Sequence, residues 1–517
     1  MEDKPDRVFA GHMSAGFRGD CLRRIRDLEK AGRLADALAE FERLLAAEAP
    51  VFSAALLLEY GRLLWLDRQS TRALAVWEQL VLDPSAASYA GKALYNLAKA
   101  QAESGQSSRA AALYERLLAL EPETREALFN LANLRQKTGA PEAALPLYRR
   151  LLALEPGRVE AWINCARACK SCGDYERAEF CLGRALALAP TAVTAHWNLA
   201  HVCLSQGRFA EGWAEYEWRL RRPEAFIPAG VEKIAPWRGE NLRGRRLLLW
   251  SEQGAGDAIQ FVRFAAKLSG PPACVALLCQ DNLRRLLQSA PGIDLVLPFS
   301  SLPEGFDFQL SLLSLPWRLG LHTQAELSAR PYLAAGPPVA KGGPAGVGKF
   351  PFHQFDDSRI KVGLVWSGNP FHVNDARRSI AFSELAPLGR IAGMCFFSLQ
   401  KAVKRESLPQ AQREIQPLID LAPWMNDFAA TAWVLQQLDL LLSVDTAVAH
   451  LAGALGVPAW ILLPCEADWR WGLKGRRSYW YDSVRLFRQP KPGDWRSVIA
   501  ALGEALASFV KADFLRG

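Results

Sequence analysis

Residues 130–156 read NLANLRQKTGAPEAALPLYRRLLALEP, and the same pattern returns along the chain at a fixed step. The step is 34 residues, and it is kept by four glycines: Gly105, Gly139, Gly173 and Gly207. Three prolines keep the same step: Pro122, Pro156 and Pro190. Glycine tolerates the backbone conformation that ends a helix, and proline cannot continue a helix. The period therefore predicts repeated pairs of helices, each pair joined by a tight turn.

Small and aromatic residues stand at constant offsets after each glycine. The small residues, which let two helices approach closely, are Ala110, Ala144 and Ala178. The aromatic residues, which fill the groove between repeats, are Tyr114 and Tyr148. This pattern resembles the tetratricopeptide repeat (TPR), with about six units when the weaker outer copies are counted. We therefore expect an all-α TPR superhelix over residues 1–222.

An asparagine precedes each glycine by nine residues, at Asn96, Asn130, Asn164 and Asn198. These positions fall on the first helix of each repeat, which lines the concave face of a TPR superhelix. An amide offers two donors and an acceptor, so a row of them can bind an extended peptide backbone. The O-linked N-acetylglucosamine transferases show a similar ladder. The alternative is that these amides only join helix to helix, and the sequence leaves both open.

Composition excludes several classes of function. The chain has 517 residues and a formal net charge of +8, without a basic tract that would indicate nucleic-acid binding. We find no secretory signal and no apolar run of roughly 18 residues, so we expect a cytoplasmic protein without a membrane span. Ten cysteines are present. Four of them, which include a formal C-x-x-C, are read as reduced, packed thiols rather than a metal or redox site: Cys165, Cys169, Cys172 and Cys181.

The second half of the chain shows no repeat and reads as α/β. Apolar runs such as 245–250 are followed by a glycine-rich turn and a helical segment, which is the start of a doubly wound unit. A glycine- and proline-rich stretch at 336–348 predicts a linker. We expect two such domains, over 230–340 and 358–517, with a closing helix near 494–510.

Two motifs, one in each predicted domain, carry a family resemblance. Residues 251–257 read SEQGAGD, and residues 443–456 read SVDTAVAHLAGALG. Together they resemble the heptosyltransferase-like glycosyltransferase family 9. The resemblance implies a GT-B fold of two Rossmann-like domains, the first on the acceptor side and the second binding a nucleotide sugar. The fusion as a whole resembles bacterial TPR glycosyltransferases, including those that modify flagellin.

The first motif supplies the candidate catalytic base. The resemblance gives Asp257 the role of taking the acceptor's proton in an inverting transfer, with Gly254 and Gly256 shaping its loop. The competing interpretation is that Asp257 only caps the following helix, as aspartate often does.

The second domain supplies the candidate donor site. The helix after Asp445 and Thr446 can hold a phosphate at its N-terminus, beginning with Ala447, while Asp445 faces sugar or ribose hydroxyls. His450 contacts the donor or is an ordinary helix histidine. The turn at Ser367 is expected nearby.

The resemblance also places a cation on the diphosphate, for which we choose Arg378 over Arg377. Lys401 either binds phosphate or base, or is a surface lysine. No acidic Asp-x-Asp pair stands in a matching place, so we expect no metal and no cofactor, the nucleotide sugar being a substrate. Trp469 and Trp471 are read as packing residues in preference to ligand contacts.

The leading hypothesis is an inverting, metal-independent glycosyltransferase that modifies Ser or Thr of a protein held by the repeats, flagellin being a plausible acceptor. One alternative is a glycosyltransferase acting on a surface polysaccharide or lipid-linked glycan. Another is an inactive TPR scaffold that binds a nucleotide sugar. The sequence does not indicate the sugar, the nucleotide or the oligomeric state.

Overall fold

The computed structural model describes residues 15–48, 53–301, 304–335, 359–372, 374–401, 412–415 and 417–514. The predicted linker at 336–348 lies outside the described residues. The chain divides into two compact units, Met1–Pro190 and Thr191–Gly517. Each unit is described by itself.

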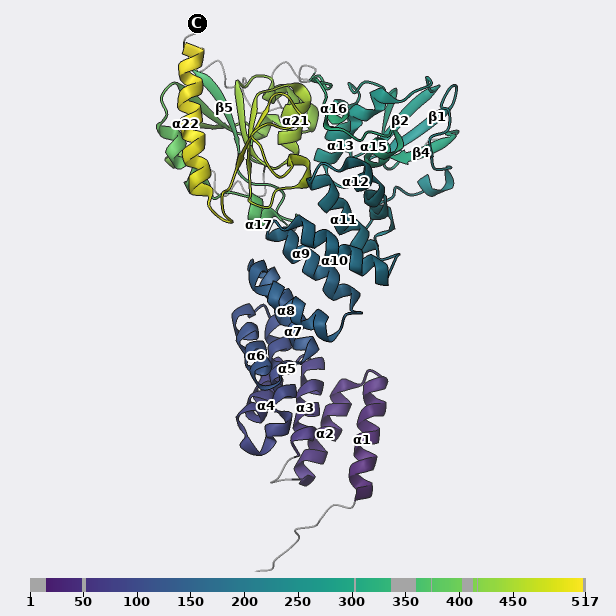
Figure 1. The fold of residues 1–517 in the computed structure, drawn as a ribbon, viewed down its shortest axis with the longest axis vertical. Helices are drawn as coiled ribbons and strands as arrows, with labels where there is room; N and C mark the ends of the chain where they lie inside the picture. Colours follow the sequence, from purple (N-terminus) through teal and green to yellow (C-terminus); the bar gives the residue numbers. More distant parts are fainter. Residues whose placement is uncertain are drawn as a thin grey trace, which may run out of the picture. The chain divides into compact units, whose positions relative to one another are not determined.

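The first unit is a row of helix pairs in which each helix packs against the next along the chain (Figure 1). Its helices are α1 (Ala15–Lys30), α2 (Leu34–Glu48), α3 (Ala54–Leu66), α4 (Ser70–Leu82), α5 (Ala87–Glu103), α6 (Ser107–Leu120), α7 (Arg125–Lys137), α8 (Pro141–Leu154), α9 (Val159–Ser171) and α10 (Tyr175–Leu188). Together with one further pair in the second unit, they make the six repeats that the sequence predicts.

The periodic residues act as the sequence predicts. Gly105, Gly139 and Gly173 follow the first helix of their pairs with φ of 78°, 83° and 78°, a left-handed conformation in which glycine ends a helix without strain. The alanines of the second helices are fully buried between neighbours, as Ala144 shows. Tyr114 fills the same core.

The second unit begins with the sixth helix pair, α11 (Val193–Ser205) and α12 (Phe209–Tyr216), followed by a short turn of helix at Glu217–Arg221. This pair is joined to the α/β part by buried polar contacts. The Trp213 indole N–H donates to the Leu321 carbonyl at 2.9 Å. Arg219 Nη2 donates to Glu252 Oε1 at 2.7 Å and to Ser314 Oγ at 2.8 Å. The last repeat is therefore part of the same compact body as the α/β layers.

The first sheet has four parallel strands in the order β3-β2-β1-β4. The strands are β1 (Arg246–Trp250), β2 (Cys274–Cys279), β3 (Leu295–Pro298) and β4 (Phe308–Ser311). Helices α13 (Ala255–Phe261), α14 (Arg284–Leu287), α15 (Leu315–Arg318) and α16 (Gln324–Leu327) accompany them.

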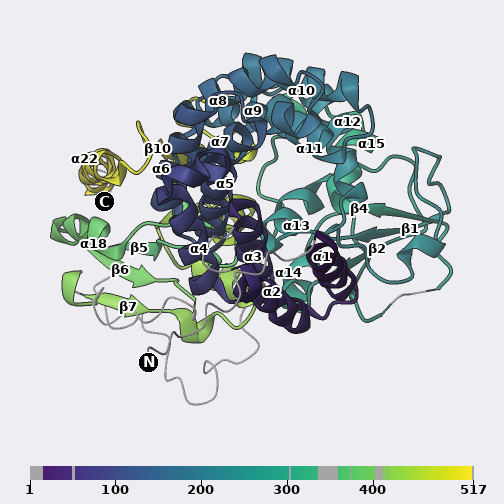
Figure 2. The same ribbon diagram turned by 90° about the horizontal axis from the view of Figure 1, so that it is seen from below.

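The second sheet has six parallel strands in the order β10-β9-β8-β5-β6-β7, and Figure 2 shows β5, β6 and β7 side by side. The strands are β5 (Ile360–Val365), β6 (Met394–Ser398), β7 (Leu418–Asp420), β8 (Leu440–Val444), β9 (Ala459–Leu463) and β10 (Val484–Arg488). The helices around them are α17 (Asp375–Arg378), α18 (Phe382–Leu385), α20 (Phe428–Leu435), α21 (Ala447–Leu455) and α22 (Trp495–Phe514).

Side chains alternate between two cores across each strand, because successive residues of a strand point to opposite faces. On β9, Ile461 enters the large core that also contains Leu249 of β1 and Ala452 of α21. Leu462 enters a second core, which α22 covers with Leu502 and neighbouring residues. The closing helix thus packs on the outer face of the second sheet.

The observed architecture confirms the predicted fold class, an all-α repeat region followed by an α/β region with parallel sheets of the GT-B-like kind. Strand β1, Arg246–Trp250, falls on the predicted apolar run 245–250. Strands β7 and β10 were missed. Of the helices that the structure describes, none has the length and apolar character needed to cross a membrane.

Candidate functional site

The carboxyl ends of β1 and β8 each lead through a short loop into a helix, α13 or α21, and the two helices meet. Ligands of parallel sheets bind at such strand ends. The contact is close at Gly256, where a Cβ atom would lie 3.0 Å from His450 Cδ2 and 3.3 Å from Ala447 Cα. Glycine therefore allows the two predicted motifs to lie against each other.

Asp257 lies in the first turn of α13 and binds two donors. The Gly254 N–H donates to its Oδ2 at 2.9 Å, and Arg470 Nη2 donates to its Oδ1 at 2.5 Å. Burial raises the pKa of Asp257, while Arg470 opposes that rise. The side chain is still 17% exposed, so a hydroxyl group can reach it.

The competing interpretation of Asp257 as a helix cap holds in a modified form. The N-cap residue is Gly254, and Asp257 stands three residues later with its carboxylate on the Gly254 N–H. Each carboxylate oxygen has a second lone pair, so this bond leaves acceptor capacity for a proton. The role of Asp257 as a base stays a prediction.

Arg470 is the central residue that the sequence analysis missed. It is buried, and besides Asp257 it donates to Asp468 Oδ1 at 2.9 Å and to Gln260 Oε1 at 2.9 Å. It thereby joins α13 of the first sheet to the loop after β9. Its motif, residues 468–472, was noticed only for its tryptophans.

Asp445 follows β8 at the mouth of the same site. Burial, and then the neighbouring carboxylate of Asp468, raise the pKa of Asp445 to about 6, against the pull of Arg378 and Arg470. Its Oδ1 lies 4.0 Å from His450 Nε2. A partly exposed carboxylate here can accept hydrogen bonds from sugar or ribose hydroxyls.

The N-terminus of α21 is half-buried and lies beside this site. Thr446 is the N-cap residue, yet its side chain makes no capping bond, and its hydroxyl lies 3.1 Å from Ser443 Oγ instead. The first N–H groups of a helix have no partner within the helix, Ala447 being the first helical residue. They can therefore receive the phosphate of a nucleotide.

His450 lies on the same helix and is buried. Its Nδ1 lies 3.0 Å from the Tyr481 hydroxyl, and its ring stacks on Trp471 at 5.0 Å between centroids. Burial lowers the pKa of His450 to about 3, so the ring is neutral at physiological pH. Contact between this ring and a donor is untested.

Arg378 lies on the inner side of the loop after β5. Its Nη2 would be only 2.6 Å from a Cβ on Gly368, and its Nε lies 3.5 Å from Asp375 Oδ1. Arg377, by contrast, is half exposed and pairs with Glu466. Arg378 is thus the less exposed of the two arginines, and its contact with a diphosphate stays a prediction.

Ser367 and Lys401 differ in their surroundings. The backbone of Ser367 exchanges two hydrogen bonds with the Gln400 amide, both at 3.2 Å, while its buried hydroxyl has no partner among the described residues. Lys401 is exposed, with its Nζ 5.7 Å from the Phe428 ring centroid. Burial of part of the side chain lowers the pKa of Lys401.

Trp469 and Trp471 are packing residues, as the preferred interpretation held. Both are buried, and Trp469 meets the Trp213 ring edge-on at 5.5 Å between centroids.

The asparagines of the repeats take part in bonds between helices. Asn130 donates to the Tyr95 hydroxyl at 3.2 Å, and Asn164 donates to Asn133 Oδ1 at 2.9 Å. The Asn198 amide nitrogen is buried and lacks a partner among the described residues, and no side-chain bond is recorded there for Asn96. Two of the four asparagines, Asn130 and Asn164, therefore join helix to helix. Peptide binding by the four asparagines is untested.

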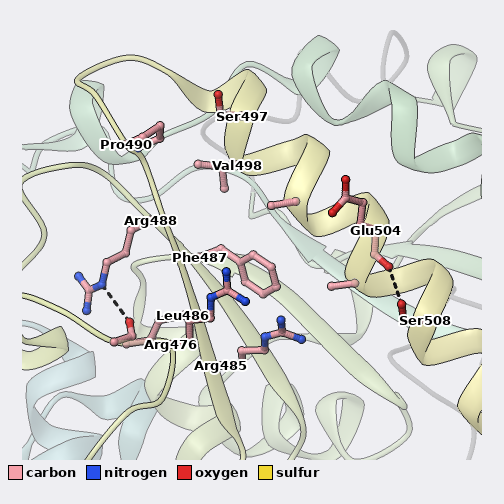
Figure 3. A pocket seen from close by; sticks show the side chains of 13 residues that line it. Arg476, Arg485, Leu486, Phe487, Arg488, Pro490, Ser497, Val498, Glu504 and Ser508 are labelled. Atoms are coloured by element: carbon pink, nitrogen blue, oxygen red, sulfur yellow. Dashed lines mark hydrogen bonds between the residues drawn. The ribbon is translucent and has the colours of Figure 1, made fainter.

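A hollow of about 660 Å³ lies away from this site, between β10 and α22 (Figure 3). Arg476, Arg485 and Arg488 line one side and Ser497 and Ser508 the other. None of the predicted site residues lines it, so it is not the predicted donor site.

Both halves of the chain match known protein families. One tetratricopeptide repeat family matches residues 22–89, 95–159 and 173–222. A second tetratricopeptide repeat family matches residues 135–186. Residues 379–462 match glycosyltransferase family 9 (heptosyltransferase). This segment contains Asp445, Thr446 and His450.

Protein FlbA of Caulobacter vibrioides is 27% identical over 328 residues, which cover 59% of this chain and 53% of that protein. The chain thus spans about half the length of this curated relative. Among solved structures, a tetratricopeptide repeat protein from Parabacteroides merdae is 20% identical, with 39% and 77% of the two chains covered and a TM-score of 0.33. MamA from Desulfovibrio magneticus is 18% identical, with 32% and 92% covered and a TM-score of 0.29.

Proposed function

We propose that this chain, which carries tetratricopeptide repeats and a glycosyltransferase family 9 domain, transfers a sugar from a nucleotide donor to a Ser or Thr hydroxyl of a protein. The observation that carries the proposal is the meeting of α13 and α21 at Gly256. It brings a carboxylate, Asp257, to the same strand-end site as the N-terminus of α21.

The reaction follows from the chemistry of these groups. Asp257 takes the proton of the acceptor hydroxyl as its oxygen attacks the anomeric carbon of the donor sugar. The bond from that carbon to the diphosphate oxygen breaks, and the configuration at the carbon inverts. The nucleoside diphosphate leaves with negative charge, which the N-terminus of α21 and Arg378 stabilise. These residues supply the positive charge, so we expect no metal requirement.

Arg470 opposes the effect of burial on the proposed base. Burial alone favours the neutral acid of Asp257, and a neutral acid cannot accept a proton. The guanidinium of Arg470 offsets this effect and fixes the orientation of the carboxylate through Oδ1. The second oxygen of Asp257 is then the one nearer the loop of Gly254.

The repeats favour a protein acceptor over a glycan. TPR arrays present an extended surface that binds peptides. Flagellin is our candidate acceptor, on the resemblance to TPR-fused flagellin glycosyltransferases. The polysaccharide or lipid-linked acceptor and the inactive scaffold are the outcomes against which this proposal is tested.

The test begins with donor identification on the full chain, by thermal shift with UDP-, GDP- and ADP-sugars, and with CMP-sugars as donors that lack a diphosphate. Transfer to the candidate acceptor is then measured by mass spectrometry for wild type, Asp257→Asn and a control, Asp281→Asn. Asp281 is highly exposed, at 81% of its side chain, and lies outside the site. We expect Asp257→Asn to bind the donor within a few-fold of wild type and to lose transfer. EDTA should leave the wild-type rate unchanged.

Three results would count against the proposal. Unchanged transfer by Asp257→Asn would remove its role as base. Transfer to a glycan but not to any protein would establish the alternative acceptor class. Donor binding without transfer to either would favour the scaffold.

A further inference from the structure

Three cysteine thiols meet inside the first unit, between the neighbouring helices α9 and α10 (Figure 1). Cys165 and Cys169 stand four residues apart on α9, so both point from the same side of that helix. Cys181 faces them from α10. The three sulfur atoms lie within 4.8 Å of one another, and the Cys165 and Cys181 sulfurs are 3.8 Å apart.

The C-x-x-C spacing that the sequence shows is not what forms this group. Its second cysteine, Cys172, caps the end of α9 and is outside the trio. The third thiol comes instead from Cys181 on the facing helix. The group therefore depends on the packing of the helix pair and cannot be read from spacing alone.

The sulfur geometry matches a metal bound by three thiolates. Metal–thiolate bonds of about 2.3 Å, as found for zinc, separate the sulfurs of one site by about 3.8–4.0 Å. The Cys165–Cys181 separation of 3.8 Å falls in this range, and all three sulfurs lie within 4.8 Å of one another. Among the described residues, no fourth His, Cys, Asp or Glu side chain completes the group. Structural zinc sites take four protein ligands, so the set of three soft donors suits an ion that accepts three-coordination.

The three thiols lie in the interior of the first unit. All three thiols are buried. A metal binds cysteine as the thiolate, so binding at this buried group displaces the three thiol protons.

We propose a binding site for a soft metal ion, Cu(I), whose ligands are the thiolates of Cys165, Cys169 and Cys181. The bound ion ties α9 to α10 within the fifth repeat. The site is independent of the glycosyltransferase chemistry and has its own residues. Copper binding is expected to stabilise the helix pair, because an ion that binds only the folded state shifts the unfolding equilibrium.

The first experiment measures copper bound by the reduced full chain under anaerobic conditions, after gel filtration with a competing Cu(I) chelator. Wild type is expected to retain one equivalent more than Cys169→Ala/Cys181→Ala. The matched control is Cys172→Ala/Cys465→Ala, which removes two cysteines outside the trio, Cys465 being exposed. The control should retain as much copper as wild type. Equal retention by wild type and the site variant would overturn the proposal.

A second measurement needs no variant and so holds even if the site variant does not fold. X-ray absorption of the copper-loaded wild-type chain should show a first shell of three sulfur atoms. A shell of nitrogen and oxygen, or of two sulfurs, would contradict the assignment. A Cys165–Cys181 disulfide formed in place of copper retention, detected by peptide mapping, would also overturn it.

Discussion

The proposed base is held by an arginine that comes from far along the chain. Arg470 donates to Asp257 and to Asp468, and it also lies over the Trp469 ring at 4.3 Å. A buried guanidinium shared by two carboxylates fixes both in position and favours their charged forms. The pKa of Asp468 is lowered to about 2, while burial outweighs Arg470 at Asp257, whose pKa is raised. Burial raises the pKa of the neighbouring Asp445 as well.

Asp445→Asn should change the pH dependence of stability. The pKa of Asp445, about 6 in the folded chain, lies above the ordinary aspartate value of 3.8. The folded state therefore binds more protons between these values, so this group lowers the free energy of unfolding as pH rises from 3.8 through 6. Asparagine does not titrate, so the variant lacks this fall in the free energy of unfolding. The measurement is urea unfolding of wild type and variant at pH 4 and pH 7.

We expect the free energy of unfolding of the variant, minus that of wild type, to be larger at pH 7 than at pH 4. A difference between the two proteins that is the same at both pH values, or smaller at pH 7, would show that Asp445 titrates normally.

Arg68→Gly should stabilise the first unit. Arg68 occupies the turn between α3 and α4 with φ of 62°, the left-handed conformation that glycine provides in the later repeats. An arginine there is strained, and relief of that strain is expected to exceed the entropy cost of glycine, by about 0.5–1 kcal/mol. The measurement is the urea midpoint of the full chain. Gly139→Ala is the reverse control, since a Cβ there meets no atom within 4 Å and only strain is added. A fall in the midpoint for Arg68→Gly would contradict the account.

At the scale of elements, the amide ladder is part of the repeat packing as well as a candidate peptide surface. The Tyr148 hydroxyl donates to Asn133 Oδ1 at 2.6 Å, and Asn164 donates to the same oxygen. These bonds join α7, α8 and α9. The side chain of Asn96 on α5 makes no hydrogen bond within the described residues. A variant at Asn96 therefore tests peptide binding without disturbing a bond between helices.

Asn96→Ala should weaken binding of the acceptor protein while leaving stability unchanged. Asn130→Ala should weaken binding and also lower stability by about 1 kcal/mol, because it loses its bond to Tyr95. Asn133→Ala is the control for a purely structural amide and should lower stability alone. Fluorescence anisotropy with labelled acceptor and urea unfolding measure the two effects. If Asn96→Ala binds as wild type does, the ladder is structural.

The same scale shows what sequence can predict. The glycine period and the apolar runs are local signals, so the sequence predicts the helix pairs and strands such as Arg246–Trp250. Strand β7 has only three residues, and arginines at Arg485 and Arg488 interrupt the apolar residues of β10, so neither gives a clear apolar run. The bond of Arg470 to Asp257 spans 213 residues, and no spacing rule reaches that far. Asp257 itself was found because its motif is short and contiguous.

At the scale of the whole molecule, the repeats do not end where the enzyme begins. The repeat pattern continues to residue 222, but the compact units divide at Pro190 and Thr191, one repeat earlier. The buried pair of Arg219 and Glu252 explains this, together with the burial of Trp213 in the large core. The sixth repeat is thus a structural part of the α/β unit.

Two truncations test this division. Residues 191–517 should fold and bind the donor, since they keep the sixth repeat. Residues 223–517 lose Arg219 and leave Glu252 buried without its partner, which costs about 3–5 kcal/mol in addition to the exposed core. We expect that fragment to aggregate or to unfold well below the other. Circular dichroism and thermal unfolding decide, and equal stability of both fragments would contradict the role of the sixth repeat.

The most direct test of the proposed function is the intact mass of flagellin from cells that lack this gene, complemented with wild type or with Asp257→Asn. Such cells supply the natural donor, so the sugar need not be known beforehand. We predict added mass on Ser or Thr with the wild-type gene and none with the variant, at equal protein levels. An identical flagellin mass in all strains would contradict flagellin as the acceptor, and modification that persists with Asp257→Asn would contradict the proposed base.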